Sequence, residues 1–343
     1  MLKQGTVIRA ASAGSAEVER GAIEIGTLAS GRPVQVPYML RRGRQPGPCL
    51  WVNGAVHGDE INGVFAAQRF FERVRTADLA GTVVVTPVSN VLAFDERRKT
   101  TAIDGIDMDQ SFPGRADGFA TERLAAKLFE RFGGEADVTV NIHTLGTPFT
   151  ALPYAVYKVH PNGSVPESRL LSLISCFEPT VACRMPVSGA GGELPGNIAG
   201  ALDYQMLARG KAAFMVELGS GGCLDEAAVE QGVRGLARLA ARLGMIEKHS
   251  VGQGAPRLRR VTARAHKLAA SGGLFEPLAT PGTVLPAGAP LGRVRNLFGD
   301  IEEEIVVEGE SHIIAMRRDP VVHSGDRVAF LASRWDEVTT HDG

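Results

Sequence analysis

The chain has 343 residues, of which 44% are hydrophobic, and this length and composition allow one large core and a smaller second one. Its 37 lysines and arginines nearly balance its 38 aspartates and glutamates, without a block of like charge, which argues against nucleic-acid or polybasic membrane binding. No segment approaches the roughly 20 apolar residues of a membrane span, and the N-terminal segment lacks the apolar core of a signal peptide. We therefore expect a cytoplasmic protein that acts on small molecules.

Cysteine usage agrees with a reducing compartment. The four cysteines have no CxxC spacing and lie in apolar or glycine-rich segments. We expect free thiols, with neither disulfides nor a cysteine-based zinc site. These residues are Cys49, Cys176, Cys183 and Cys223.

Strand and helix patterns alternate through the first 245 residues. Short β-rich segments at 22–43 and 48–56 are followed by helical spacing of apolar residues at 61–74. Such alternation predicts an α/β domain over residues 1–250, built on a mixed sheet flanked by helices. The later elements of this pattern are strands at 81–88, 136–143 and 212–218 and helices at 120–132 and 225–245.

The remainder of the chain has a different pattern. After the linker-like segment GQGAP at 252–256, short β-like pieces are separated by glycine and proline. Within them, 281–292 and 319–331 resemble each other, each with a turn, a β-branched pair, a glycine turn and a strand. We predict a small C-terminal all-β domain over 255–336, a sandwich or flattened barrel of two similar halves.

The segment NGAVHGDEING at 53–63 contains a candidate metal motif. His57 follows an apolar strand, so it should lie at the carboxyl edge of the sheet, where ligand sites gather in open α/β folds. Glu60 is expected in the first helical turn, on the same side as His57. Imidazole and carboxylate both bind zinc, but a glutamate early in a helix is also favoured by the helix dipole without any metal.

A catalytic zinc site takes three protein ligands and leaves a position for water. His143 ends a second β-rich segment, VTVNIH, and so occupies the same architectural position as His57. For any single histidine, a surface or hydrogen-bonded core position is the alternative. The other histidines follow a weaker pattern or belong to the linker and the tail, away from this edge: His160, His249, His266, His312, His323 and His341.

Hydrolysis also requires a carboxylate that is not a metal ligand and a positive group that stabilises an oxyanion. Glu217 follows the apolar segment AAFMV and precedes glycines, although it could simply end a strand. The segment DERRKT supplies Arg97, Arg98 and Lys99, at least two of which are expected to be solvated surface charges.

The chain resembles the succinylglutamate desuccinylase/aspartoacylase family, which is related to the zinc carboxypeptidases. The resemblance lies in GPCLWVNGAVHGDEING, NVLAFDERRKTTAIDGIDMDQSFPG, VNIHT and VELGSGG, between residues 47 and 222, and the tail resembles the family's β-domain. It implies a zinc carboxypeptidase-like fold with one Zn²⁺ per chain. The implied roles are zinc ligands for His57, Glu60 and His143, general base and acid for Glu217, and carbonyl polarisation for Arg98, or Arg97 after a one-residue shift.

Two departures from the family pattern concern the substrate and the support of the metal. Where the family has DLNR or NLNR before FPG, this chain has DMDQ, so Asp109 and Gln110 replace the asparagine and arginine that hold a substrate carboxylate. The family's aspartate two residues before the third ligand is Asn141 here. The substrate is therefore expected to lack a carboxylate at that place or to carry a cation that Asp109 could pair with.

The sequence thus predicts a zinc-dependent hydrolase that removes a small acyl group from an N-acyl amino acid or related amine. The alternatives are a metallocarboxypeptidase-like peptidase and a non-catalytic relative that binds zinc or a ligand. The glycine-rich segment 189–196 could act as a lid or be an ordinary connection. The β-domain could cover the active site, stabilise the chain or pair subunits into a homo-oligomer.

Overall fold

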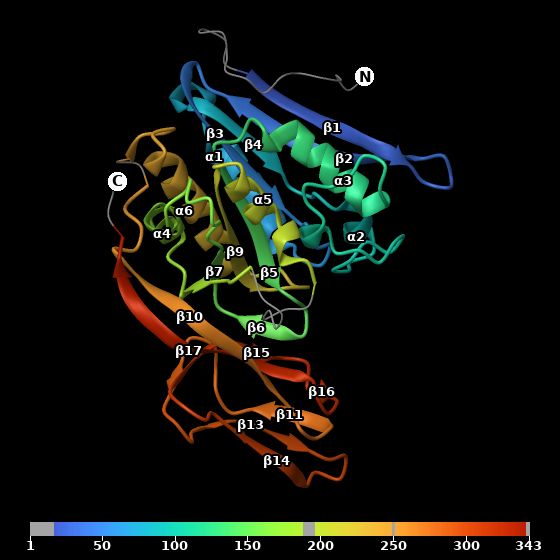
Figure 1. Ribbon diagram of the computed structural model, residues 1–343, viewed down its shortest axis with the longest axis vertical. Coiled ribbons are helices and arrows are strands. Elements are labelled where there is room, and N and C mark those ends of the chain that lie inside the picture. The colour runs from blue at the N-terminus through green and yellow to red at the C-terminus, as the bar shows by residue number, and fades with distance from the viewer. Residues whose placement is uncertain (1–16, 188–195, 249–250, 341–343) are drawn as a thin grey trace.

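A computed structural model describes residues 17–187, 196–248 and 251–340, and its main feature is one mixed 13-stranded sheet (Figure 1). Within it β4, β3, β5 and β9 are neighbours and run parallel, so their carboxyl ends meet at one edge. The strands, in sheet order, are β1 (Glu17–Thr27), β2 (Pro33–Arg42), β4 (Ala80–Thr86), β3 (Gln45–Gly54), β5 (Val138–Leu145), β9 (Ala212–Ser220), β7 (Tyr154–Tyr157), β8 (Ala182–Arg184), β10 (Arg257–Leu268), β17 (Arg327–Thr339), β15 (Ser311–Arg317) and β12 (Val284–Leu285), with β6 (Phe149–Ala151) paired to β15.

Helices cover both faces of the α/β part of this sheet. Successive residues of β3 point to opposite faces, so Val52 belongs to one apolar core with Phe70 and Leu236, and Trp51 belongs to another with Leu124. Each large apolar side chain buried in this way contributes roughly 1.5–3 kcal/mol, which makes the strand ends a rigid base for a site. One face carries α1 (Asn62–Arg73), α4 (Glu167–Ile174) and α6 (Glu226–Arg242), and the other carries α3 (Ala120–Leu128) and α5 (Leu202–Ala208), while α2 (Val91–Asp95) follows β4.

The C-terminal strands form a second layer and also continue the main sheet. β10 pairs in parallel with β8, so the sheet runs across the predicted boundary at 250–255, and the division into two domains stays a prediction. The second sheet has the order β14 (Ile301–Val306), β13 (Pro290–Arg295), β11 (Gly273–Pro277) and β16 (Val321–Val322). A separate apolar core that includes Phe275, Ile313 and Val328 lies between this sheet and the end of the first.

The predicted similarity of segments 281–292 and 319–331 has a structural counterpart. Each contains a two-residue strand, a turn and a longer strand: β12 then β13, and β16 then β17. Gly288 and Gly325 occupy the two turns with φ of 79° and 88°, a conformation that favours glycine. The two halves exchange sheets, because β12 and β17 lie in the main sheet while β13 and β16 lie in the second.

The observed architecture confirms the predicted fold class, an α/β mixed sheet flanked by helices with a C-terminal β region. The strands and helices expected at 48–74, 81–88, 120–143 and 212–245 are all present, with ends shifted by a few residues. Among the described residues, no helix combines the length and the apolar character needed to span a lipid bilayer. All four cysteines lie in the described ranges, and none of them forms a disulfide.

Candidate metal centre and active site

His57 and Glu60 lie in the loop that connects β3 to α1. Glu60 precedes the helix, which begins at Asn62, so the expectation that it lies in the first helical turn is wrong. Gly58 lets this loop pack against α2, because a Cβ there would be 2.0 Å from the carbonyl oxygen of Ala93, and its N–H donates to the carbonyl of Arg98 at 2.8 Å. The loop therefore holds its two polar side chains by close backbone packing.

His57, Glu60 and His143 converge on one point, as the sequence predicted. Nδ1 of His57 lies 2.7 Å from Oε1 of Glu60, and Nδ1 of His143 lies 2.9 Å from Oε2 of the same carboxylate. One ligand atom from each residue can be chosen so that all three lie within 4.8 Å of one another, and all three side chains are buried. Two imidazoles and a carboxylate in this arrangement are a donor set that fits a zinc ion.

The electrostatics of the three residues favour positive charge between them. Burial alone would lower the pKa of His57, but the carboxylates of Glu60 and Asp107 outweigh burial and raise it well above its usual value. The pKa of His143 is raised in the same way, chiefly by Glu60. Burial opposes ionisation of Glu60, yet the two histidines lower its pKa to about 2. A site that stabilises protons here would also stabilise a divalent cation.

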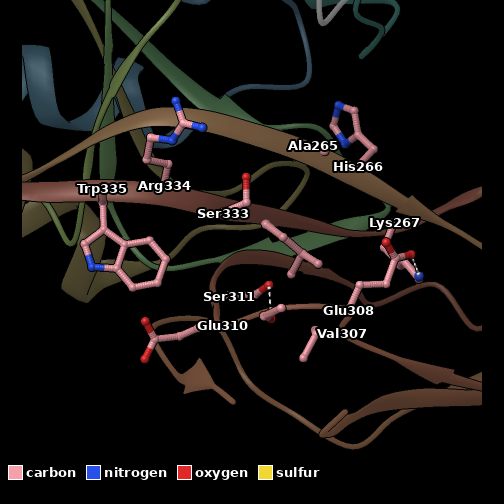
Figure 2. A pocket seen from close by; sticks show the side chains of 12 residues that line it. Ala265, His266, Lys267, Val307, Glu308, Glu310, Ser311, Ser333, Arg334 and Trp335 are labelled. Atoms are coloured by element: carbon pink, nitrogen blue, oxygen red, sulfur yellow. Dashed lines mark hydrogen bonds and ion pairs between the residues drawn. The ribbon is translucent and has the colours of Figure 1, made fainter. Parts of the chain in front are cut away.

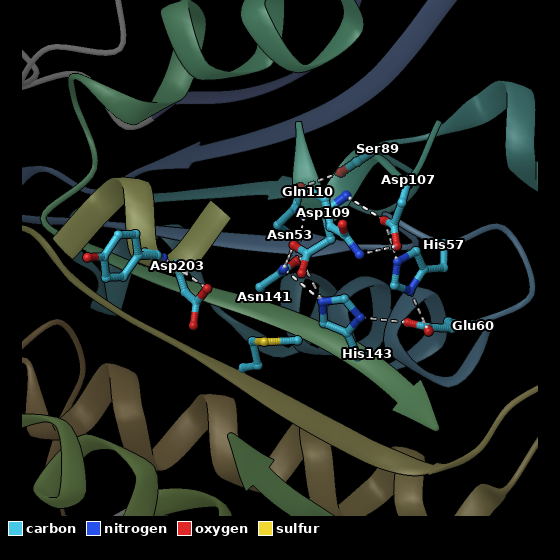
Figure 3. A network of polar contacts seen from close by, with 12 residues as sticks. Asn53, His57, Glu60, Ser89, Asp107, Asp109, Gln110, Asn141, His143 and Asp203 are labelled. Carbon is cyan, nitrogen blue, oxygen red and sulfur yellow. Dashed lines mark hydrogen bonds and ion pairs between the residues drawn. The ribbon is translucent and has the colours of Figure 1, made fainter. Parts of the chain in front are cut away.

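A directional chain of hydrogen bonds reaches His143, and Figure 3 shows its last part, from Asn53 through Asn141 to His143. The indole N–H of Trp51 donates to the hydroxyl of Thr86 at 2.9 Å, and that hydroxyl donates to Oδ1 of Asn53 at 2.7 Å. Nδ2 of Asn53 then donates to Oδ1 of Asn141 at 2.8 Å. Because an indole nitrogen can only donate, the chain directs Nδ2 of Asn141 toward Nε2 of His143, 2.8 Å away.

The two departures from the family pattern meet in this network. Nδ2 of Asn141 also donates to Oδ1 of Asp109 at 2.9 Å, so the substituted strand position and the substituted loop position are in contact. Oδ1 of Asp109 is 3.9 Å from Nε2 of His143. Asp107 contacts the other imidazole directly, with Oδ1 3.0 Å from Nε2 of His57, whereas Asp109 is too distant for a hydrogen bond to His143. Carboxylates behind ligating imidazoles orient the ring and raise its basicity.

Glu217 lies near the end of β9, directly beside His143 in the parallel pairing of β5 and β9. Its side chain is 8% exposed, and Oε2 has no hydrogen-bond partner among the described residues. Burial raises the pKa of this carboxyl to about 7. An unpartnered carboxyl with a pKa near neutrality is suited to accept and return a proton.

One cavity of about 360 Å³ contains the three candidate ligands, Glu217, Asp109 and Gln110 in its lining. Of the three basic residues in DERRKT, only Lys99 lines it, and its Nζ lies 3.2 Å from Oδ2 of Asp107. Arg97 and Arg98 are not part of the lining, and all three side chains are exposed, that of Lys99 at 58%. The sequence named Lys99 but did not choose it, because nothing in a charge run shows which side chain reaches the cavity.

Gln110, which was expected to contact the substrate, forms hydrogen bonds with other residues of the chain. Oε1 of Gln110 accepts a hydrogen bond from the backbone N–H of Asn197 at 2.8 Å, and its Nε2 is 3.4 Å from Oδ2 of Asp107. Gln110 thus ties two loops together. The predicted lid at 189–196 lies, apart from Gly196, outside the described residues.

The sequence missed a buried ion pair in the same cavity. Nζ of Lys158 donates to both carboxylate oxygens of Asp203, at 2.7 Å and 2.8 Å, and Lys158 lines the cavity. Both side chains are essentially inaccessible to solvent. Lys158 lies just past β7, where the segment YAVYKV looks apolar, and only its partner 45 residues away explains how its charge is accommodated.

The remaining wall of the cavity comes from the C-terminal β region. It consists of four residues on β10 and β17, to which we refer as the cationic wall: Arg264, His266, Arg327 and Phe330. The expectation that His266 lies away from the α/β edge is therefore wrong. Its position depends on how the two parts of the chain pack, for which the sequence carries no local signal.

Comparison with known proteins supports these observations. Residues 46–243 match the succinylglutamate desuccinylase/aspartoacylase catalytic domain, which is more than half of the chain. The N-alpha-acetyl-L-2,4-diaminobutyric acid deacetylase of Halomonas elongata is 27% identical over 304 residues, covering 87% of this chain and 86% of the relative. Both names describe removal of an acyl group from an amine.

Solved structures share the fold over nearly the whole chain. A succinylglutamate desuccinylase/aspartoacylase from Rhodobacter sphaeroides has a TM-score of 0.78 at 23% identity, covering 94% of this chain and 96% of its own. The product-bound ectoine utilization protein EutE (DoeB) from Ruegeria pomeroyi has the same TM-score and identity, covering 92% and 95%. The fold, including the C-terminal β region, is thus common to these proteins.

Proposed function

Since the chain belongs to the succinylglutamate desuccinylase/aspartoacylase family, a family of deacylases, we propose that it is a zinc-dependent amidohydrolase that deacylates a small N-acyl amine. The observation that carries the proposal is the convergence of His57, Glu60 and His143 in the cavity that also contains the unpartnered carboxyl of Glu217. These three residues would hold one zinc ion per chain.

When bound, zinc would supply Lewis-acid activation of water and of the scissile carbonyl. Glu217 would take the proton from that water, because its carboxyl is buried, unpartnered and close to neutrality in pKa. The same carboxyl would return the proton to the leaving nitrogen. Asp107 would hold the ring of His57 in the ligating orientation through Nε2.

We assign stabilisation of the oxyanion to Lys99 in place of Arg98. Lys99 is the basic residue of its segment that lines the cavity, and its salt bridge to Asp107 restricts its position. Carboxylates raise the pKa of Lys99 against the opposing effect of burial, so it is cationic at neutral pH. A fixed positive charge at this place would lower the energy of a developing alkoxide.

The substrate that best fits the loop carries an amine. Asp109 is 8% exposed and lines the cavity where the family pattern has an asparagine, and Gln110 lacks the charge needed to bind a carboxylate there. Burial raises the pKa of Asp109, and a cationic ligand would offset that burial. An N-acyl diamino acid satisfies these conditions, and the Halomonas relative is named for such a substrate.

A matched pair of substrates tests this assignment. Nα-acetyl-L-2,4-diaminobutyrate and N-acetyl-L-2-aminobutyrate differ mainly by the terminal amine, and acetate release is measured with zinc-loaded protein. We expect hydrolysis of the first and at least about tenfold lower kcat/KM for the second, the usual loss of a charge-assisted contact. Asp109→Asn should remove this preference.

The alternatives give different results in the same assay. A carboxypeptidase-like enzyme would release C-terminal residues from dipeptides faster than acetate from either compound. A non-catalytic relative would bind zinc and release no acetate from any N-acyl amino acid or amine. Either result would overturn the proposed deacylase.

A further inference from the structure

The cationic wall is formed by two neighbouring antiparallel strands far along the chain from the metal ligands. His266 on β10 is opposite Phe330 on β17, and Leu268 is opposite Arg327. All four wall residues line the same cavity as the candidate zinc ligands. A substrate at the metal centre would therefore face, across the cavity, a surface that belongs to the C-terminal β region.

Phe330 organises two of the polar side chains. The guanidinium of Arg264 lies 4.9 Å from the centre of its ring, and the imidazole of His266 stacks on it at 4.6 Å with an interplanar angle of 23°. The ring itself is buried. Stacking on a buried ring restricts both side chains, so less entropy is lost when they bind a ligand.

His266 has buried hydrogen-bonding atoms with no partner inside the protein. Neither Nδ1 nor Nε2 has a hydrogen-bond partner among the described residues, although both atoms are inaccessible. Burial, together with the charges of Arg327 and Arg264, lowers the pKa of this histidine to about 4. The ring is thus neutral at neutral pH, so the charge of the wall comes from its two arginines.

We propose that the cationic wall binds a carboxylate of the substrate, with Arg264 and Arg327 supplying the positive charge. The proposal rests on the deacylase function inferred above. It gives a binding place to the substrate carboxylate, which the DMDQ loop cannot bind. Arginine suits a carboxylate because its planar fork can donate two parallel hydrogen bonds. The carboxylate site has moved from the loop before FPG to β10 and β17.

The distribution of charge around the cavity fits a substrate with three distinct groups. Its amine would approach Asp109, its amide would lie at the metal ligands and Glu217, and its carboxylate would face Arg264 and Arg327. A cavity of about 360 Å³ is within the range of small-ligand sites. An N-acyl diamino acid has these groups within one small molecule.

Removal of only the carboxylate from the substrate tests the proposal. N-acetyl-1,3-diaminopropane is Nα-acetyl-L-2,4-diaminobutyrate without its carboxylate, and kcat and KM are measured for both with wild type and Arg327→Gln. For Nα-acetyl-L-2,4-diaminobutyrate we expect Arg327→Gln to lower kcat/KM roughly ten- to a hundredfold, mainly by raising KM. For N-acetyl-1,3-diaminopropane, kcat/KM should fall less than about twofold. Arg264→Gln should behave alike, and Arg327→Lys should recover part of the loss.

A nearby arginine provides the matched control. Arg334 is on the same strand, β17, and lines a second cavity of about 550 Å³ (Figure 2). Of the residues that line the two cavities, only His266 is common to both. Arg334→Gln should leave both kinetic constants unchanged for both compounds. Arg327 is exposed, so its substitution should not disturb folding, and equal melting temperatures would verify this.

Binding measurements separate failure of this proposal from failure of the deacylase function. If wild type hydrolyses neither compound, the deacylase function is wrong, and calorimetry still compares the affinity of the zinc-loaded protein for the two. Tighter binding of the carboxylate compound that Arg327→Gln abolishes supports the cationic wall. Equal losses for both compounds, or no loss in either assay, would overturn it.

Discussion

The two ends of the cavity have opposite charge and different origins. Glu60, Asp107, Asp109 and Glu217 make one end acidic, and they come from strand ends and loops of the α/β part. The other end, the cationic wall, comes from β10 and β17. In our proposal the acidic end holds the metal, moves protons and binds the substrate amine through Asp109, whereas the wall binds only the substrate carboxylate. Catalysis and carboxylate recognition would thus belong to different parts of one chain, and variants at either end test this division.

The largest contrast is expected between two histidines of the same cavity. His143→Ala removes a candidate ligand and should abolish both zinc binding and acetate release, because two protein ligands rarely retain zinc. His266→Ala, at the other end, should leave zinc content at that of wild type. Metal content after dialysis, measured by mass spectrometry, checks both. Zinc retained by His143→Ala would show that the metal is held elsewhere.

The next largest effect concerns the proton carrier. Glu217→Gln preserves the size of the side chain but cannot accept a proton, so kcat should fall by about 10²–10⁴-fold. Zinc content should not change, since Glu217 is not one of the converging ligands. Stopped assays of acetate release together with metal analysis test this. Full activity in this variant would show that a group other than Glu217 carries the proton.

A smaller effect, on zinc affinity, is expected when the side chains of Asp109 and Asn141 are exchanged. The double variant Asp109→Asn with Asn141→Asp reproduces the family's arrangement and allows a carboxylate to accept the Nε2 proton of a ligating His143. Zinc affinity should rise about tenfold, the lower range for such supporting contacts.

Chelator competition measures the affinity of this exchange variant. Asn141→Asp alone places two carboxylates where Asn141 and Asp109 now lie 2.9 Å apart, so it should be less stable than the double variant. Unchanged zinc affinity in the double variant would mean that the exchange serves the substrate and not the metal.

The last effect is a pH dependence of stability in the metal-free protein. Folding raises the pKa of Glu217 from 4.5 to about 7, so this carboxyl favours the folded state below pH 4.5, and that contribution is lost as pH rises through 7. Glu217→Gln should remove this decrease in stability, because a glutamine side chain does not ionise. Its melting temperature should exceed that of wild type at pH 8 and match it at pH 4.5. Equal melting temperatures at pH 8 would show that Glu217 is not desolvated.

The sequence was sufficient for most features that depend on local pattern, although it placed Glu60 in the first turn of a helix that begins at Asn62. Alternating apolar periods predicted the strands and helices of the α/β part, and parallel strands brought the residues at their carboxyl ends together. His57, Glu60 and His143 could be named for this reason, and Glu217 could be chosen as a companion. Short polar motifs at strand ends are readable because the sheet itself fixes their neighbours.

Only the tertiary structure decided what depends on packing between distant segments. Arg98 and Lys99 are equivalent in a charge run, and only the structure shows that Lys99 is the one that lines the cavity. Asp109 and Asn141 looked like two unrelated substitutions until β5 and the DMDQ loop were seen in contact. Arg327 is 270 residues from His57, and no pattern along the chain relates them. Their shared cavity exists because β8 pairs with β10, a contact set by the whole sheet.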